Sequence, residues 1–218
     1  MAKINEITAS KLLIVEGNHE RDFFVAWFTR LAIQDIQTMP IGGKTLLSNN
    51  LQSLVKQPQF PHVASLVIVR DADDNPNGAF QSVCTTLSTV SIPVPAKPWI
   101  WHTTQNPANT ASSIRICVII LPDGQNHGAL EELLMQTVIG DVMFNDATGL
   151  VTTAVNKLAV PASTRKPPPV HRHGKAKAHA FLSTFEEPDK DQGKAAGKGV
   201  WDFNHTALAP LKQILQQM

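Results

Sequence analysis

The sequence has no long apolar run and very little cysteine. No stretch approaches the ~20 apolar residues that a helix needs to cross a membrane, and the first residues show no basic stretch followed by an apolar signal core. Its 2 cysteines, Cys84 and Cys117, lack the spacing of a metal site, and the apolar run around Cys117 predicts a buried position. These absences predict a protein without disulfides or membrane segments, which we expect in the cytoplasm.

The chain also lacks a net charge large enough to indicate a partner. Its 218 residues carry a formal charge of +1, and 43% of them are hydrophobic, which is enough for a sizeable core. The local distribution is more informative, because residues 147–185 contain no Asp or Glu. Several cations fall in that segment: Lys157, Arg165, Lys166, Arg172, Lys175 and Lys177. A basic surface for an anionic ligand is expected there.

Apolar runs alternate with helical patterns along the first part of the chain. This order predicts a three-layer, Rossmann-like α/β fold, with a mostly parallel sheet flanked by helices. We expect an α/β core over residues 1–140 and a mainly helical C-terminal extension over 141–218, packed on the core as one structural unit. Strands are expected at 12–15, 36–41, 65–69 and 114–121, and helices at 20–32, 45–56, 79–87, 130–139, 140–160, 175–185 and 206–217.

Three segments have no clear periodicity. Residues 91–112 are rich in Pro, Thr, Asn and Ser, which predicts a loop with at most one short edge strand. Residues 164–174 contain consecutive prolines, which exclude a helix, so a basic loop is expected there. Residues 186–199 are interpreted as a polar connection.

Carboxylates follow three of the predicted strands. Glu16 comes after the first, Asp71 and Asp73 after the third, and Asp123 after the most apolar strand. A single acid at a strand end is more often a turn former or a helix cap. In a parallel sheet, however, these ends lie at one edge, where unpaired carboxylates repel one another. The set therefore predicts a site for a hard divalent cation, Mg²⁺ or alternatively Mn²⁺.

The order of these acids resembles the Toprim domain of topoisomerases, bacterial primases and OLD-family nucleases. The motifs are Val15–Glu16–Gly17 with Glu20, and Asp71–Ala72–Asp73 after a later strand. The wider chain resembles small stand-alone OLD-like Toprim proteins of unassigned function. Further matching elements are Gly42–Gly43–Lys44, Leu121–Pro122–Asp123, Gly128–Ala129–Leu130–Glu131 and Trp201–Asp202–Phe203.

The resemblance implies roles for the acids. Glu16 would act as general acid/base or metal ligand, and Asp71 and Asp73 would hold Mg²⁺. Glu20 stands where the family has a second acid. Two-metal chemistry on a phosphodiester would need further ligands.

Two more acids are candidates for a second metal position. Glu131 could provide it together with Asp123, but an acid in the first turn of a helix also complements the helix dipole, and both interpretations stay open. Its neighbour Glu132 is expected in solvent.

Cations could complete the site. Gly42, Gly43 and Lys44 precede a helix and could bind a phosphate, although a tight turn explains the two glycines equally well. The resemblance implies a catalytic lysine after the basic loop, either Lys175 or Lys177, and a solvated basic face is the other interpretation. The sequence does not choose between the two lysines.

The pattern favours Mg²⁺-dependent phosphodiester chemistry on nucleic acid, as a nuclease. The alternative is a non-catalytic module that binds metal, nucleotide or nucleic acid and acts with a partner protein, since no ATPase motif or DNA-reading domain accompanies these acids. A haloacid-dehalogenase-type phosphatase fits less well, because its D-x-D follows the first strand.

Overall fold

The computed structural model describes residues 5–158, 166–188 and 191–218. Five strands form one sheet in the order β2-β1-β3-β5-β4. β1, β2, β3 and β5 are parallel, and β4 pairs antiparallel with β5 at the edge. The strands are β1 (Lys11–Val15), β2 (Ile36–Pro40), β3 (Ser65–Asp71), β4 (His102–Asn106) and β5 (Asn109–Leu121). The predicted mostly parallel α/β sheet is confirmed.

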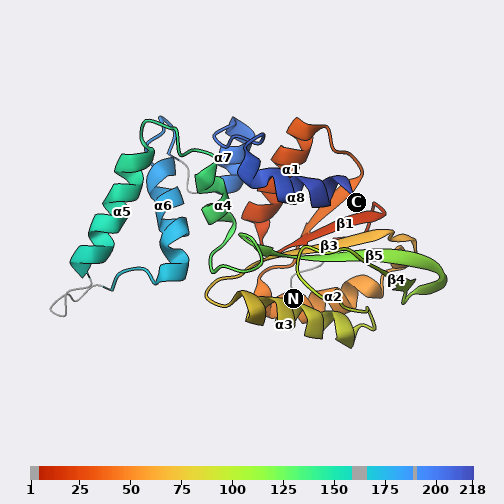
Figure 1. Cartoon of the computed structure of the whole chain (residues 1–218). Coiled ribbons are helices and arrows are strands. Elements are labelled where there is room, and N and C mark those ends of the chain that lie inside the picture. The colour runs from red at the N-terminus through yellow and green to blue at the C-terminus, as the bar shows by residue number, and fades with distance from the viewer. Residues whose placement is uncertain (1–4, 159–165, 189–190) are drawn as a thin grey trace.

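Helices cover both faces of this sheet, as Figure 1 shows. The α-helices are α1 (Asn18–Leu31), α2 (Leu47–Val55), α3 (Pro76–Thr89), α4 (Leu130–Gln136), α5 (Phe144–Leu158), α6 (His173–Leu182), α7 (Gln192–Lys198) and α8 (Ala209–Gln216). Short 3-10 turns are η1 (Lys44–Leu46), η2 (Phe60–His62), η3 (Val170–Arg172) and η4 (Thr206–Leu208). α2 and α3 lie on one face, and α1 and α8 on the other (Figure 1).

Alternating strand residues divide the core into two apolar clusters. Leu13, Val67 and Ile119 face the side of α1, whereas their neighbours Leu12 and Ile68 face α2 and α3. This alternation follows from the period of two residues in a strand. The aromatic residues of α1 are buried in the first cluster, as their helical spacing predicts: Phe23, Phe24, Trp27 and Phe28.

The helical extension joins the first cluster rather than building a separate one. Phe181 of α6, Ala196 of α7 and Leu211 of α8 are buried together with strand residues. α5 and α6 project beyond the end of the sheet, with α6 between α4 and α5 (Figure 1). No helix among the described ranges is long and apolar enough to span a bilayer.

Two expectations for the less regular segments are wrong. The polar stretch 186–199 contains α7, whose residue Ala196 is buried. Residues 164–174 hold η3 and the start of α6, because the prolines end at Pro169 and the chain after them is free to become helical. Part of that stretch, residues 164–165, lies outside the described residues. The edge strand expected within 91–112 is β4.

Candidate active site

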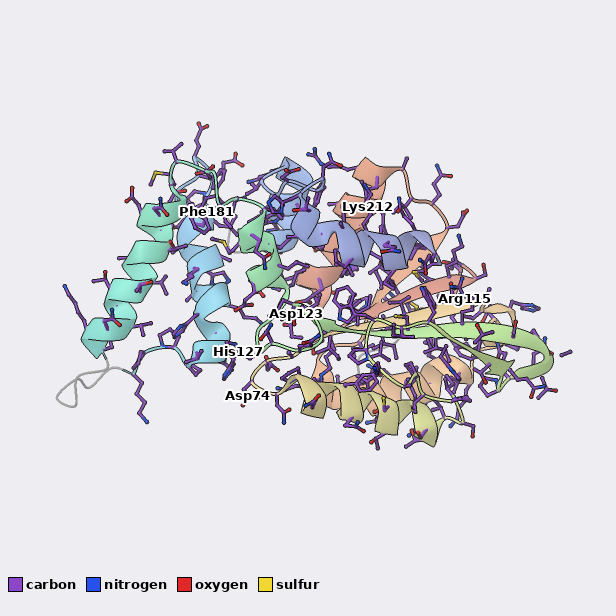
Figure 2. The ribbon with its side chains drawn as sticks, viewed as in Figure 1. Asp74, Arg115, Asp123, His127, Phe181 and Lys212 are labelled. Carbon is purple, nitrogen blue, oxygen red and sulfur yellow. The ribbon has the colours of Figure 1, made fainter. Side chains whose placement is uncertain are left out.

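The parallel strands bring several of the sequence-predicted acids to one end of the sheet. Asp71 is the last residue of β3 and pairs in register with Leu121, the last residue of β5. Glu16 directly follows β1. Figure 2 shows Asp74, Asp123 and His127 at this end, beside α6, and Arg115 at the opposite end. The candidate site therefore lies where ligands bind in open α/β sheets.

Asp71 is at the centre of the site and is held by two donors. It is only 5% exposed. The backbone N–H of Leu130, at the start of α4, donates to Asp71 Oδ1 at 3.1 Å. The ammonium of Lys175, from α6, donates to Oδ2 at 3.1 Å. Residues 104 positions apart in sequence thus share one partly buried ion pair.

Glu131 is the second buried acid and is 3% exposed. Its Oε1 accepts a hydrogen bond from Gln192 Nε2 at 3.1 Å, and Gln192 is itself fixed by Trp201 Nε1, which donates to its backbone oxygen at 3.0 Å. Glu131 Oε2 is buried and has no hydrogen-bond partner among the described residues. One carboxylate oxygen is therefore left for a ligand.

Glu16 has a different partner. Its Oε1 lies 3.4 Å from Arg70 Nε, which makes an ion pair, and both atoms are buried without a hydrogen-bond partner among the described residues. Glu20, in the first turn of α1, lies close to Gly17: a Cβ added at Gly17 would stand 3.0 Å from Glu20 Oε2. The small residue after Glu16 thus leaves room for the second acid.

The pKa values show that these acids interact. Burial raises the pKa of Asp71 well above its ordinary range, and Lys175 opposes that rise. The charges of Glu131, Glu16 and Glu20 raise it further. Burial likewise raises the pKa of both Glu16 and Glu131. The site therefore holds more carboxylates than the protein's own cations neutralise.

The pKa of Lys175 is raised as well, which for a lysine favours the charged form. Burial alone would lower the pKa of its ammonium, but Asp71 and Glu131 outweigh burial and raise the pKa. Lys175 therefore remains charged at neutral pH, beside the two most buried acids of the site.

Asp73 and Lys44 form the outer part of the site. Lys44 Nζ lies 3.0 Å from Asp73 Oδ2. Asp73 has a φ of 51° and exchanges two backbone hydrogen bonds with Gly128, which fix its left-handed conformation. The Gly43 N–H, a candidate phosphate donor, donates instead to the backbone oxygen of Glu16 at 2.8 Å. The glycine turn thus ties the start of η1 to the end of β1.

Asp123 does not join the acids. Its Oδ1 accepts from the backbone N–H groups of Gln125 and Asn126, and its Oδ2 from Asn126 Nδ2 at 2.7 Å. Burial would raise the pKa of Asp123, but these hydrogen bonds outweigh it and lower the pKa. In the structure this carboxylate closes the loop after β5.

The two candidate lysines occupy different places. Lys175 contacts Asp71, whereas Lys177 lines a groove on the other side of α6. Lys175 is positioned by Glu132, whose Oε1 accepts from the backbone N–H of Gly174 at 3.0 Å and whose Oε2 accepts from that of Ala129 at 2.7 Å. The expectation that Glu132 is solvated is therefore wrong: its carboxylate joins the first turns of α4 and α6.

The oxygen atoms of the site suit a hard cation, although the acids are not arranged as a preformed cage. Across residues 5–158, 166–188 and 191–218, no three acidic, histidine or cysteine side chains are grouped as a metal-binding cluster. The protein's own cations pair with three of the acids, Arg70 with Glu16, Lys44 with Asp73 and Lys175 with Asp71. Glu16 Oε1 and Glu131 Oε2 accept no hydrogen bond from the described residues, and such carboxylate oxygens suit a hard cation such as Mg²⁺ or Mn²⁺.

Two members of the site were not found from the sequence. Arg70 interrupts an otherwise apolar strand directly before Asp71, and that interruption was an available signal. Gln192 lies in a polar stretch and carries no local signal, because its role depends on the packing of α7 on α1. A Cβ at Gly193 would stand 2.7 Å from the backbone oxygen of His19, so only glycine allows this close approach.

Comparisons with known proteins place the chain in a family and give one remote structural likeness. Residues 10–218 match the model of a family described as "Protein of unknown function (DUF3226)". The chain is similar to the solved C-terminal region of the Burkholderia pseudomallei OLD protein, at 14% identity and a TM-score of 0.48, with 97% of this chain and 98% of that chain covered. No curated protein matches the chain.

Proposed function

The chain belongs to the DUF3226 family of unknown function, and we propose that it hydrolyses phosphodiester bonds in nucleic acid with the help of a divalent cation, as a nuclease. One observation carries the proposal. Acids from three separate elements, the buried Asp71 and Glu131 and the partly buried Glu16, act on one another electrostatically, and the ammonium of Lys175 reaches them from the helical extension. Such a concentration of buried charge is costly unless it serves a ligand or a reaction.

Asp71 and Asp73 would hold the cation, and Glu20 and Glu131, whose charges act on the same site, offer further carboxylate oxygens. All of these donors are carboxylate oxygens, which Mg²⁺ prefers and Mn²⁺ accepts. When bound, the cation would neutralise phosphoryl oxygens and acidify a coordinated water.

The chain's own residues supply the remaining chemistry. The raised pKa of Glu16 suits a group that takes up and returns a proton near neutral pH. Lys175 is the candidate for stabilising the negative charge that develops on the phosphoryl group. Lys44, more exposed, is the candidate for orienting a neighbouring phosphate. The Toprim resemblance of Val15–Glu16–Gly17 and Asp71–Ala72–Asp73 supports these assignments.

The test is cleavage of plasmid DNA and of labelled DNA and RNA oligonucleotides with Mg²⁺, Mn²⁺ or a chelator. We expect cleavage that needs the metal and that falls by about 10²-fold or more in Glu16→Gln, Asp71→Asn and Lys175→Met. Asp35→Asn is the matched control, because this exposed carboxylate precedes β2 at the opposite end of the sheet. Cleavage that survives in Glu16→Gln and Asp71→Asn would refute the mechanism.

The same experiment separates the alternative function. If the protein binds the oligonucleotides with every metal but never cleaves them, it acts as a binding module together with a partner protein.

A further inference from the structure

A groove on the outer side of α6 shares its wall with the acidic site. It has a volume of about 420 Å³ and is lined by residues of α4, α5, α6, the loop before α4 and the turn η3. A groove of this size is within the range of small-ligand sites, and it is large enough for one nucleotide.

Pairs of adjacent residues connect the groove to the acids. Glu132 lines the groove and its neighbour Glu131 belongs to the site. Gly174 lines the groove and its neighbour Lys175 binds Asp71. The groove and the acidic site therefore lie next to each other, on either side of the Glu132–Gly174 contact between α4 and α6.

The charge of the groove suits a phosphate. Lys177, His127 and His173 line it, and Lys177 forms no ion pair within the part of the chain that the structure describes. Residues 147–185, which provide most of α5 and all of α6, contain no acid. Glu132 is the one acid in the lining, and its two oxygens already accept hydrogen bonds from backbone N–H groups.

The remaining lining suits a base. Ile139, Phe144 and Val170 provide apolar contact, and Ile139 is a large aliphatic side chain that is 58% exposed. Stacking on aromatic and apolar side chains above a cationic groove is how proteins bind unpaired nucleotides. A base that is paired within a duplex cannot enter such a groove.

We propose that this α4–α6 groove binds an unpaired nucleotide of single-stranded nucleic acid next to the scissile phosphate. The inference rests on the proposed function for the identity of the neighbouring site, and it specifies the substrate: a strand that is single at this position, rather than a continuous duplex.

The test is binding without cleavage. Fluorescence anisotropy in EDTA would follow the full chain with an oligothymidylate of about 12 nucleotides, a length within the range of single-strand sites, and with a duplex of equal length. We expect single strand to bind at least about tenfold more tightly than duplex. Lys177→Glu and Ile139→Glu should each weaken single-strand binding by about tenfold. Lys177→Glu should also reduce the salt slope by about 0.7 per lost phosphate contact.

Two matched controls distinguish a specific effect of the groove from a general effect of added negative charge on binding. Lys56→Glu introduces the same charge change at the end of α2, on the other face of the sheet. Leu150→Glu alters an equally exposed α5 residue, 66% accessible, outside the groove lining. Both should bind within about twofold of the wild type, and melting curves would verify that all variants are folded.

The binding results for the groove variants and for the duplex decide whether the inference stands. If Lys177→Glu and Ile139→Glu bind like the wild type, or if duplex binds as tightly as single strand, the inference is overturned, even for a protein that cleaves DNA. If binding depends on the groove but no metal supports cleavage, the inference stands and the nuclease proposal fails.

Discussion

The two regions that meet at the acidic site contribute different groups and reach it in different ways. The α/β core provides Glu16, Asp71 and Asp73 at or just beyond the ends of adjacent parallel strands, so the sheet itself brings them together. The helical extension provides Lys175 and Gln192 from helices that have to be held in place by packing. The acids are therefore fixed by backbone register, whereas the cation is fixed by side-chain contacts that a single substitution can remove.

The largest expected effect comes from breaking the hydrogen bond between Glu132 and Gly174, which holds α6 of the helical extension against α4. In Gly174→Ala, the new Cβ would collide with the carboxylate of Glu132, which accepts the Gly174 N–H. We expect a loss of about 1–3 kcal/mol of unfolding free energy, as for other overpacked positions, and a loss of the Lys175–Asp71 contact. Urea unfolding and a cleavage assay would measure the two effects.

Gly197→Ala is the control for this substitution. Gly197 lies within α7, and a Cβ there would meet no atom within 4 Å. The change should stabilise the protein by about 0.5–1 kcal/mol, because alanine favours a helix over glycine. Equal behaviour of the two variants would contradict the view that the Glu132–Gly174 contact holds α6.

The fold and the acidic half of the site could be predicted from the sequence because their signals are local. An apolar run followed by Glu16, or by Asp71, shows both a buried strand and a carboxylate at its end. The contact of Glu132 with Gly174 spans 42 positions and leaves no local trace. The two lysines two residues apart on a helix had to point in different directions, but only the packing of α6 against α4 decides which one faces Asp71.

Glu131→Gln tests whether the site holds more negative charge at neutral pH than its cations neutralise. Because burial raises the pKa of Glu131 above its ordinary value of 4.5, its contribution to stability is present below that value and is lost as the pH rises through the folded pKa. Without metal, we expect the variant to be more stable than the wild type near pH 7, by roughly 1 kcal/mol or about 2–4 °C. The difference should shrink toward about pH 4.

Melting temperatures in EDTA across this pH range would test the sign. The glutamine retains an Oε1 that can accept from Gln192, so the change removes a charge rather than a hydrogen bond. A difference that does not change with pH would mean that Glu131 is not the group that titrates. If the wild type instead gains stability toward neutral pH, the carboxylates of the site do not destabilise the metal-free protein.

The smallest expected effect belongs to the exposed ion pair on the core side. Lys44 is 55% exposed and Asp73 27%, so Lys44→Ala should change the unfolding free energy by less than about 1 kcal/mol. If Lys44 orients a phosphate, the variant should nevertheless raise KM more than it lowers kcat, because an interaction made equally with substrate and transition state is lost. Lys56→Ala provides the control on the outer face of α2, with both parameters unchanged. A fall in kcat alone would instead give Lys44 the role assigned to Lys175, and the division between a core that provides acids and an extension that provides the catalytic cation would no longer hold.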